Sequence, residues 1–438
     1  MLWLEFLVVI ACIVLGARLS GVGMGFAGGV GLLVLVFVFG LRPSTPPVDV
    51  LLIIVAVGGM AATLQAAGGL DYLVAIAERI LRRNPNHITI MGPLVSFFFT
   101  VFTGTSYVAL AVFPVISEVA LDAGVRGERP MSASLVASQH GISASPVSAA
   151  TATLVALMAS AGLTVGQVMM VALPSILIAV VLGSLSVYRK GLPLDEDPDY
   201  RAKVASGELT KRTGERKAYV PSREARISVS VFTLAVVAIV VLGSFKSLLP
   251  SWQVGGKTVV LSIPNVIEMI GLAASCFIVL ACRVKPGKVV NNSVFSSGMT
   301  GVIAIFGIAW MTDTFFMAHK SAFISTLGGL VQAQPWLFAV VLFFMAALLL
   351  SQGATTRSLM PVGISLGIPM PYLVAMAPAV NGLFFIPATG TAIAAMSFDR
   401  SGTTRIGSFL LNHSFMRPGL VTCISSVAIG FLFAMVVF

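Results

Sequence analysis

The sequence predicts an all-α membrane protein that crosses the bilayer many times, and three observations support this class. Of its 438 residues, 57% are hydrophobic and only 10% are charged, whereas soluble domains carry about 25% charged residues. Several apolar stretches, such as 227–249 and 421–438, approach or exceed the roughly 20 residues that a spanning helix needs. The ten-residue alternation typical of membrane β-barrels is absent, so we expect helical spans.

The predicted elements follow one another along the chain in a regular order. Two short stretches, 68–84 and 313–331, are predicted to be interfacial or embedded in the membrane. Two others, 130–160 and 371–396, are rich in small and hydroxyl residues around Pro146 and Pro387, and predict hairpins that enter the membrane and return. Complete spans are predicted at 2–17, 21–40, 47–66, 87–104, 164–188, 227–249, 260–282, 295–312, 334–352 and 416–437.

One long polar segment, 189–226, divides the chain into two halves of similar content. It holds ten Lys/Arg and seven Asp/Glu, and we interpret it as a cytoplasmic linker rather than a catalytic domain. The N-terminal repeat is then 1–188 and the C-terminal repeat is 227–438. Each has about five spans, and an odd number inserts the second repeat upside down, as in many secondary transporters.

The same pattern of interruption occurs in both halves. A hydrophobic segment breaks at Gly104-Thr105-Ser106, and another breaks at Gly353-Ala354-Thr355-Thr356. Gly104 and Gly353 are 249 residues apart, as are Leu110 and Leu359. Paired interruptions of this kind indicate the binding site of a transporter, so we expect one broken helix and one re-entrant hairpin in each repeat.

Basic residues predict the orientation. If both termini are periplasmic, 20 of the 27 Lys/Arg face the cytoplasm, including all ten of the linker. Arg126 and Arg129 are among the six that would face outward. The positive-inside rule favours this orientation over the reverse.

Hydroxyl residues at the breaks and hairpins are the first candidates for substrate binding. The free N–H groups at the start of a half-helix attract carboxylates, and freed carbonyls suit a coupling cation. The alternative for each residue is that it only permits close helix packing. The candidates are Thr105, Ser106, Ser143, Ser145, Thr355, Thr356, Thr389 and Thr391.

Arg357 is the strongest single candidate, because ionisable residues inside a membrane often mark a substrate path and a guanidinium can grip a carboxylate. The alternative is an arginine that snorkels to the surface. Asp313, His140 and Asn381 are secondary candidates. Asp313 could equally lie at the interface, and His140 could equally serve helix packing.

Other classes of function lack support. The positive charge lies in loops beside spans, which argues against nucleic-acid binding. No nucleophile elbow or Walker A motif indicates an enzyme, and the histidines and cysteines show no metal-ligand spacing. The glycine run 21–31 lies inside an apolar span, so we expect it to serve close packing rather than nucleotide binding. We expect no cofactor beyond a coupling Na⁺ or H⁺, and no residue pattern indicates an oligomeric state.

Several longer motifs resemble the Dcu family of anaerobic C4-dicarboxylate transporters of bacterial inner membranes. The resemblance covers nearly the whole chain. The runs 46–50 and 398–400 look closer to the B-type fumarate–succinate exchanger than to the A-type. The motifs that carry the resemblance are Gly16-Ala17-Arg18, Leu64-Gln65-Ala66-Ala67-Gly68-Gly69-Leu70-Asp71, Leu81-Arg82-Arg83-Asn84-Pro85, Ser143-Ala144-Ser145-Pro146-Val147-Ser148, Gly307-Ile308-Ala309-Trp310-Met311, Phe398-Asp399-Arg400-Ser401-Gly402-Thr403-Thr404 and Asn412-His413-Ser414-Phe415.

The resemblance implies an antiporter that takes in fumarate, malate or aspartate and exports succinate. It also implies contact with a sensor kinase, for which the region around Asp399 would be the candidate surface. The alternative function is a cation-coupled uptake carrier for another small carboxylate or an amino acid on the same fold.

Overall fold

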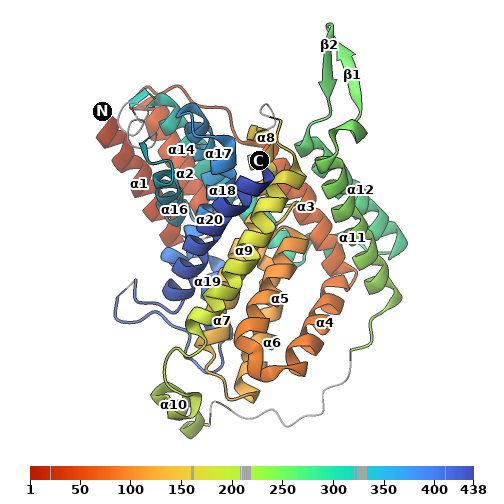
Figure 1. Ribbon diagram of the computed structural model, residues 1–438, viewed down its shortest axis with the longest axis vertical. Coiled ribbons are helices and arrows are strands. Elements are labelled where there is room, and N and C mark those ends of the chain that lie inside the picture. Colours follow the sequence, from red (N-terminus) through yellow and green to blue (C-terminus); the bar gives the residue numbers. More distant parts are fainter. Residues whose placement is uncertain are drawn as a thin grey trace.

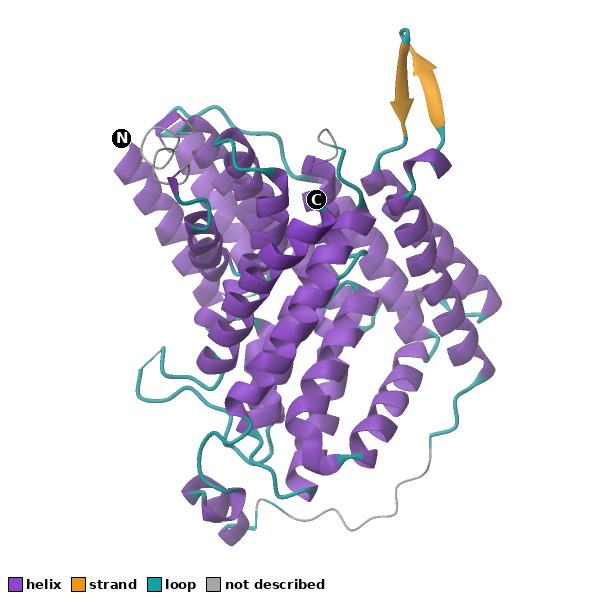
Figure 2. Ribbon diagram, viewed as in Figure 1, coloured by secondary structure: helices purple, strands orange, loops and turns teal. Residues whose placement is uncertain are grey.

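The computed structural model describes residues 1–19, 21–158, 162–207, 209, 219–319, 321–322, 333–409 and 411–438. It shows a helical bundle (Figures 1 and 2). Among the described residues, seven helices are long and apolar enough to cross a membrane, and one bent pair makes an eighth candidate. We call the end of the molecule that carries α10 (Pro198–Ala205) the linker face. Both chain termini lie at the opposite face (Figure 1).

In the described part of the chain the elements are α-helices (α), 3₁₀-helical segments (η) and one small antiparallel pair of strands (β). In the first half they are α1 (Leu2–Leu19), α2 (Val22–Phe37), α3 (Val48–Ala66), α4 (Gly69–Arg83), η1 (Pro85–His87), α5 (Ile88–Thr103), η2 (Ser106–Val108), α6 (Ala109–Asp122), α7 (Glu128–Ser143), α8 (Ala149–Met158) and α9 (Val165–Val187), followed by η4 (Leu194–Glu196) and α10 in the linker. In the second half they are α11 (Arg223–Ser244), η5 (Lys246–Leu248), β1 (Ser251–Val254), β2 (Lys257–Val260), α12 (Ile263–Ala281), α13 (Pro286–Val290), α14 (Ser293–Ala318), α16 (Leu337–Leu349), α17 (Gln352–Ser365), α18 (Met370–Met376), η6 (Ala377–Phe385), α19 (Gly390–Phe398) and α20 (Met416–Val437).

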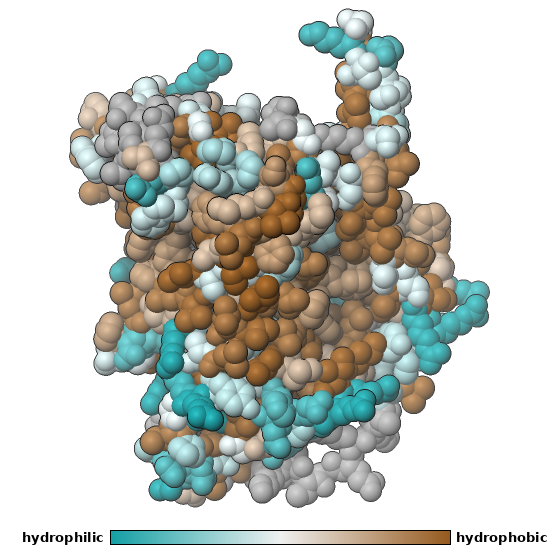
Figure 3. All heavy atoms as spheres, in the orientation of Figure 1, coloured by the Kyte–Doolittle hydropathy of each residue, from teal (hydrophilic) through white to brown (hydrophobic). Residues whose placement is uncertain are grey.

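The surface confirms the predicted class of membrane protein. Hydrophobic atoms form a broad band across the face of the molecule seen in Figure 3, and hydrophilic atoms gather towards its ends. Large apolar side chains on the spans point outward, as Leu234, Leu272 and Phe277 do, being 60–68% exposed. Such exposure suits a lipid environment, because a soluble monomer rarely exposes a large contiguous apolar patch.

Glycines allow the flanking helices α1, α2, α3, α11, α12 and α14 to pack closely. A Cβ on Gly28 would lie 2.4 Å from the backbone carbon of Gly307, and one on Gly25 would lie 2.0 Å from the carbonyl oxygen of Ile303. The backbones of α2 and α14 therefore touch at this crossing. The glycine run serves close packing, as the sequence predicts.

The first predicted span with a break, 87–104, corresponds to residues 85–103, which are long and apolar enough to cross a membrane, and it forms the first arm of a hairpin with α6. Gly104 ends α5 in the left-handed conformation at φ 75°, and α6 then runs back along α5, so that Gly92 of α5 lies against Ile116 of α6. Arg82, just before α5, bonds to Glu118 near the end of α6. The start of α5 and the end of α6 therefore both lie near the linker face, and the tip of the hairpin, which lies between them in the sequence, is inside the molecule.

The second predicted span with a break, 334–352, turns back in the same way. Leu350 ends α16 at φ 49°, and α17 then returns, so that Gly363 lies against Phe338 near the start of α16. Gly104 and Leu350, both in the left-handed conformation, stand at the two reversals. Small residues let the second arm pack against the first, which favours reversal over a kinked crossing.

The two predicted hairpins are in turn broken helices that run the length of the bundle. Of residues 130–160, those up to Met158 lie in α7, in α8 and in the turn between them, and residues 159 and 160 lie outside the described part. α7 begins beside Lys190, just beyond the linker-face end of α9, and α8 ends beside Val165, where α9 begins. Residues 371–396 lie within α18, η6 and α19, a pair of helical segments bent by 59°. α18 packs near the end of α20, where Ala375 meets Gly430.

Because the predicted spans and hairpins have changed roles, Arg126 and Arg129 lie at the linker face rather than at the opposite one. Arg126 bonds to Asp197 of the linker and to Glu128, and the Nε of Arg129 donates to the carbonyl of Lys190 at 2.8 Å. Burial alone would lower the pKa of Arg126, but Glu128 and Asp197 raise it above its ordinary value. The two guanidinium groups therefore add positive charge at the linker face, which is the face that the positive-inside rule would place in the cytoplasm.

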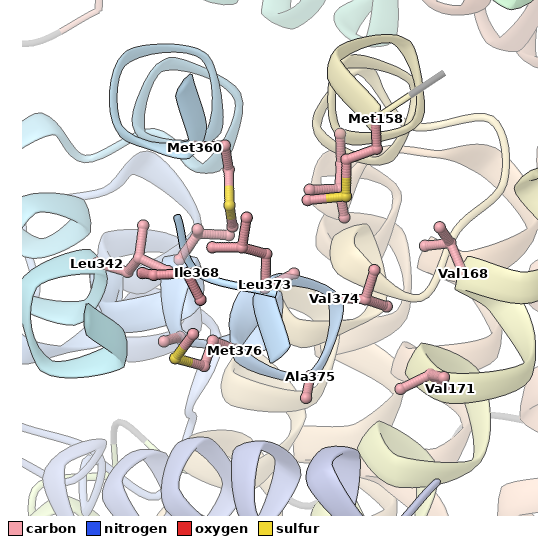
Figure 4. Close-up of a cluster of buried hydrophobic side chains, with 14 of the residues drawn as sticks. Met158, Val168, Val171, Leu342, Met360, Ile368, Leu373, Val374, Ala375 and Met376 are labelled. Atoms are coloured by element: carbon pink, nitrogen blue, oxygen red, sulfur yellow. The ribbon is translucent and has the colours of Figure 1, made fainter. Parts of the chain in front are cut away.

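We call α5–α9 and α16–α20 the central helices. The largest apolar cluster joins α8 and α9 of the first half to α16, α17, α18, η6 and α20 of the second. Met158 of α8, Met360 of α17 and Leu373 of α18 are fully buried in it, and Figure 4 shows them converging with Leu342 of α16. The cluster joins elements of both halves. Neither half therefore encloses a complete core of its own.

Two regions differ from the expectation of spans joined by simple loops. Residues 251–260 form an exposed antiparallel pair of strands, β1 and β2, which projects from the face opposite the linker (Figure 1). The predicted interfacial stretch 313–331 begins inside α14, which continues to Ala318. Residues 320 and 323–331 of that stretch, and residues 208 and 210–218 of the linker, lie outside the described part.

Candidate functional site

A cavity of about 440 Å³ lies where both hairpin tips and both breaks meet. The tip of the first hairpin contributes Gly104–Tyr107, and that of the second contributes Leu349–Ala354. The first broken helix contributes Gln139, Ile142 and the start of α8, and the second contributes Ala388–Thr391. One hairpin tip and one break from each half of the chain therefore form a single site.

Four helical segments begin at this cavity. Thr105 caps η2, which leads into α6, by accepting a hydrogen bond from the N–H of Tyr107. Ser148 accepts from Thr151 at the start of α8, and Ser351 accepts from Ala354 at the start of α17. Thr389 accepts from Ala392 at the start of α19. Each start presents backbone N–H groups and a partial positive charge, which suit an anion.

The described wall of the cavity contains no Asp, Glu, Lys, Arg or His. Its polar groups are hydroxyls, two side-chain amides and the backbone at the breaks. Any charge on a ligand would therefore be balanced by peptide dipoles rather than by a side-chain ion.

The cavity opens towards the linker face. Gly21 at the start of α2, and Val294, Ser296 and Gly298 in the first turns of α14, line its outer part. The neighbouring Asn292 donates to the carbonyl of Ala62 at the end of α3, and these ends lie beside the linker. The structure thus shows a conformation whose site is reached from the linker side.

The predicted hydroxyl residues divide into two sets. Thr105, Ser106, Thr389 and Thr391 line the cavity. The other four lie outside its wall, in the helices around it. Of these, Ser145 donates to the carbonyl of Val101 at 2.7 Å, Ser143 accepts from Asn381, Thr355 donates to the carbonyl of Ser351, and Thr356 is buried.

Arg357 lies away from the cavity and faces α14. Its Nε is 3.8 Å from Oδ2 of Asp313, and Ser358 donates to Oδ1 of the same carboxylate at 2.7 Å. The side chains of Arg357 and Asp313 are 24% and 11% exposed. The two charged candidates therefore join the second hairpin to a flanking helix.

The remaining secondary candidates brace the two breaks. His140 is fully buried, bonds to the carbonyl of Val136 through Nδ1, and stacks on Phe384. The amide of Asn381 donates to Ser143 at 2.9 Å, which ties the second broken helix to the first. Neither side chain lines the cavity.

Six polar residues of the described cavity wall are absent from the sequence-based candidates, namely Tyr107, Gln139, Ser296, Thr300, Ser351 and Gln352. Gln139 is on α7, and Ser351 and Gln352 begin α17. The sequence-based candidates are ionisable residues, hydroxyl residues at the breaks and hairpins, and one neutral amide, Asn381, but neither glutamine. The signal in the sequence would have been an amide within an apolar stretch next to a break, where burial demands hydrogen-bond partners.

Among the described residues, no group of three or more His, Cys, Asp or Glu side chains could hold a metal ion. Asp399 is buried, and hydrogen bonds from Ser401, Thr403 and Thr404 occupy both of its carboxylate oxygens. Its carboxylate therefore shapes the loop that follows α19.

Paired hairpins and broken helices around a polar cavity, inside an apolar belt, define the fold of a membrane carrier. A solved structure, the YdaH transporter of Alcanivorax borkumensis, shares this fold with a TM-score of 0.50 and 15% sequence identity over 99% of this chain and 96% of that one. The model of the anaerobic C4-dicarboxylate membrane transporter family matches residues 1–438. The chain belongs to this family, which consists of transporters and not of enzymes.

Three curated relatives cover the chain almost completely. The C4-dicarboxylate transporter DcuA of Escherichia coli K12 is 41% identical over 99% of both chains. DcuA of Wolinella succinogenes is 38% identical over 99% of both chains. The anaerobic C4-dicarboxylate transporter DcuB of E. coli O6:H1 is 37% identical over 98% of both chains. The A-type and B-type identities lie close together, so the B-type likeness of the short runs stays a prediction.

Proposed function

We propose that this chain exchanges C4-dicarboxylates across the bacterial inner membrane, taking in fumarate, malate or aspartate and releasing succinate. The observation that carries this proposal is the set of four helix starts around a cavity whose described wall holds no charged side chain. The names of the relatives support the substrate class.

The electrostatics of the cavity match a doubly charged ligand. Each helix start is equivalent to about half an elementary charge, so four of them supply about two positive charges. A dicarboxylate could place one carboxylate on the starts of α6 and α8 and the other on those of α17 and α19. The cavity volume of about 440 Å³ falls within the usual range for small-ligand sites.

The same arrangement favours exchange over one-way transport. Without a ligand, four positive helix ends face one another across the cavity, and their repulsion opposes the closure that a change of access needs. A bound dianion removes this repulsion, so the loaded carrier changes conformation more readily than the empty one.

We further propose that 1–188 and 227–438 are inverted repeats joined by a cytoplasmic linker, with both termini periplasmic. The matching hairpins and broken helices support the repeats, and the basic residues beside the linker support the orientation. Transport would move the central helices against the flanking ones. A sensor-kinase partner would contact the exposed side chains Ile406, Phe409 and Leu411 rather than the buried carboxylate of Asp399.

Counterflow in proteoliposomes tests the exchange. Vesicles loaded with succinate should take up labelled fumarate well above vesicles without succinate, with no cation gradient. Absence of this counterflow would contradict the proposal. Equal uptake into empty vesicles driven by a Na⁺ or H⁺ gradient would instead favour the cation-coupled carrier.

A further inference from the structure

Gln139 lines the cavity and carries a buried side-chain acceptor that has no hydrogen-bond partner, which a rotation of the amide would turn towards a ligand. Its side chain is 1% exposed, and its Nε2 donates to Oγ1 of Thr389 at 3.4 Å. Its Oε1 is buried and has no hydrogen-bond partner. A buried acceptor without a partner destabilises the state that contains it, so a ligand that supplies a donor gains affinity there.

The second glutamine of the wall is already engaged. Nε2 of Gln352 donates to the carbonyl of Gln139 and to Oδ1 of Asn381, both at 3.4 Å. Among the described residues that line the cavity, Gln139 is the one with a buried side-chain atom left unpaired. The two glutamines thus lie in the same wall, but only Gln139 has a buried side-chain atom that could still form a hydrogen bond with a ligand.

We infer that Gln139 discriminates among C4-dicarboxylates by accepting a hydrogen bond from a donor at C2 of the substrate, an inference that rests on the exchange proposed above. The ammonium of aspartate and the hydroxyl of malate are such donors. Fumarate and succinate carry only carboxylates, which cannot donate when ionised. Gln139 therefore favours substituted acids over unsubstituted ones, while the helix starts bind the carboxylates of all four.

The test measures how unlabelled acids inhibit the uptake of labelled fumarate into succinate-loaded vesicles. In Gln139→Met, which keeps the length and loses the acceptor, inhibition by aspartate and malate should weaken by about tenfold relative to inhibition by fumarate. Gln139→Glu keeps an acceptor and adds negative charge. In this variant, inhibition by aspartate should become stronger relative to inhibition by fumarate. The matched control Gln352→Met should change inhibition by all the acids in proportion.

Opposite shifts in the two Gln139 variants establish the role, because a packing defect would move both ratios alike. A parallel loss for every acid in Gln139→Met overturns it, since that result means that the amide turns its NH₂ towards the carboxylates. An unchanged ratio with normal counterflow also overturns it. Failure of the wild-type protein to exchange at all would instead defeat the proposed function, and binding of aspartate and fumarate to the purified variants then decides the role of Gln139 separately.

Discussion

At the scale of single residues, the charge of Arg357 is matched by Asp313 rather than by the cavity. We expect Arg357→Gln to leave the concentration of fumarate needed for half-maximal exchange nearly unchanged. The variant should lower the free energy of unfolding by about 2 kcal/mol, less than the loss of about 3–5 kcal/mol for a fully buried pair, because the guanidinium is partly exposed.

Uptake kinetics and thermal unfolding in detergent check the two parts of this prediction. The double variant Arg357→Gln with Asp313→Asn should recover part of the lost stability, because no buried charge remains unpaired. A large rise in the half-maximal fumarate concentration in Arg357→Gln would show that the guanidinium reaches the ligand in another conformation.

The hydroxyl candidates show how far single residues can be placed from sequence. Thr105 and Thr389 are recognisable because a helix that starts after a break needs a capping side chain. Thr355 and Thr356 are next to a break, but α17 begins at Gln352, a few residues earlier than expected. Each residue turns the side chain by about 100°, so a small shift of the start redirects every candidate.

At the scale of elements, the sequence locates all four interruptions but not their geometry. A reversing hairpin and a kinked crossing both need glycine, proline and hydroxyl residues. The two geometries differ in whether the segment after the break packs against the segment before it, as Ile116 of α6 packs against Gly92 of α5. That choice depends on tertiary packing, which local composition does not contain.

The crossing of α2 and α14 gives a prediction with a control in the same helix. Gly28→Val should sharply reduce the yield of folded protein, because a Cβ at Gly28 would lie 2.4 Å from the backbone of Gly307, and overpacking costs about 1–3 kcal/mol or more. Gly29→Val should be tolerated, since a Cβ there meets nothing within 4 Å. Size-exclusion profiles of the two variants compare them directly, and equal profiles would contradict the close crossing.

At the scale of the whole molecule, the cavity and the linker share one face. Ser296 is exposed at the outer part of the cavity, and Thr258 is exposed on the strands at the opposite face. In a background with the exposed Cys276 replaced by serine, we expect Ser296→Cys to react with an impermeant maleimide in inside-out vesicles. We expect the control Thr258→Cys to react in intact cells instead.

Fumarate should slow the labelling at position 296, because it draws the carrier away from the open conformation. Labelling of position 296 from the outside of intact cells would contradict the proposed orientation.

The helical class and the approximate positions of most apolar helices could be predicted from composition and charge. The face of the molecule at which Arg126 and Arg129 lie could not be predicted in this way, because it depends on which segments cross the membrane.

The pairing of α9 with α20 has a consequence for the biosynthesis of the protein. Gly183 of α9 lies so close to Thr422 of α20 that a Cβ would be 2.0 Å from the hydroxyl oxygen. α9 leaves the ribosome more than 200 residues before α20, which at about 5–20 residues per second is a delay of roughly 10–45 s. During this interval lipid or a membrane chaperone must shield the small-residue face of α9. We therefore expect the packing of the nascent carrier to be completed only when its last helix enters the bilayer, and a chain that ends before α20 to leave this face of α9 uncovered.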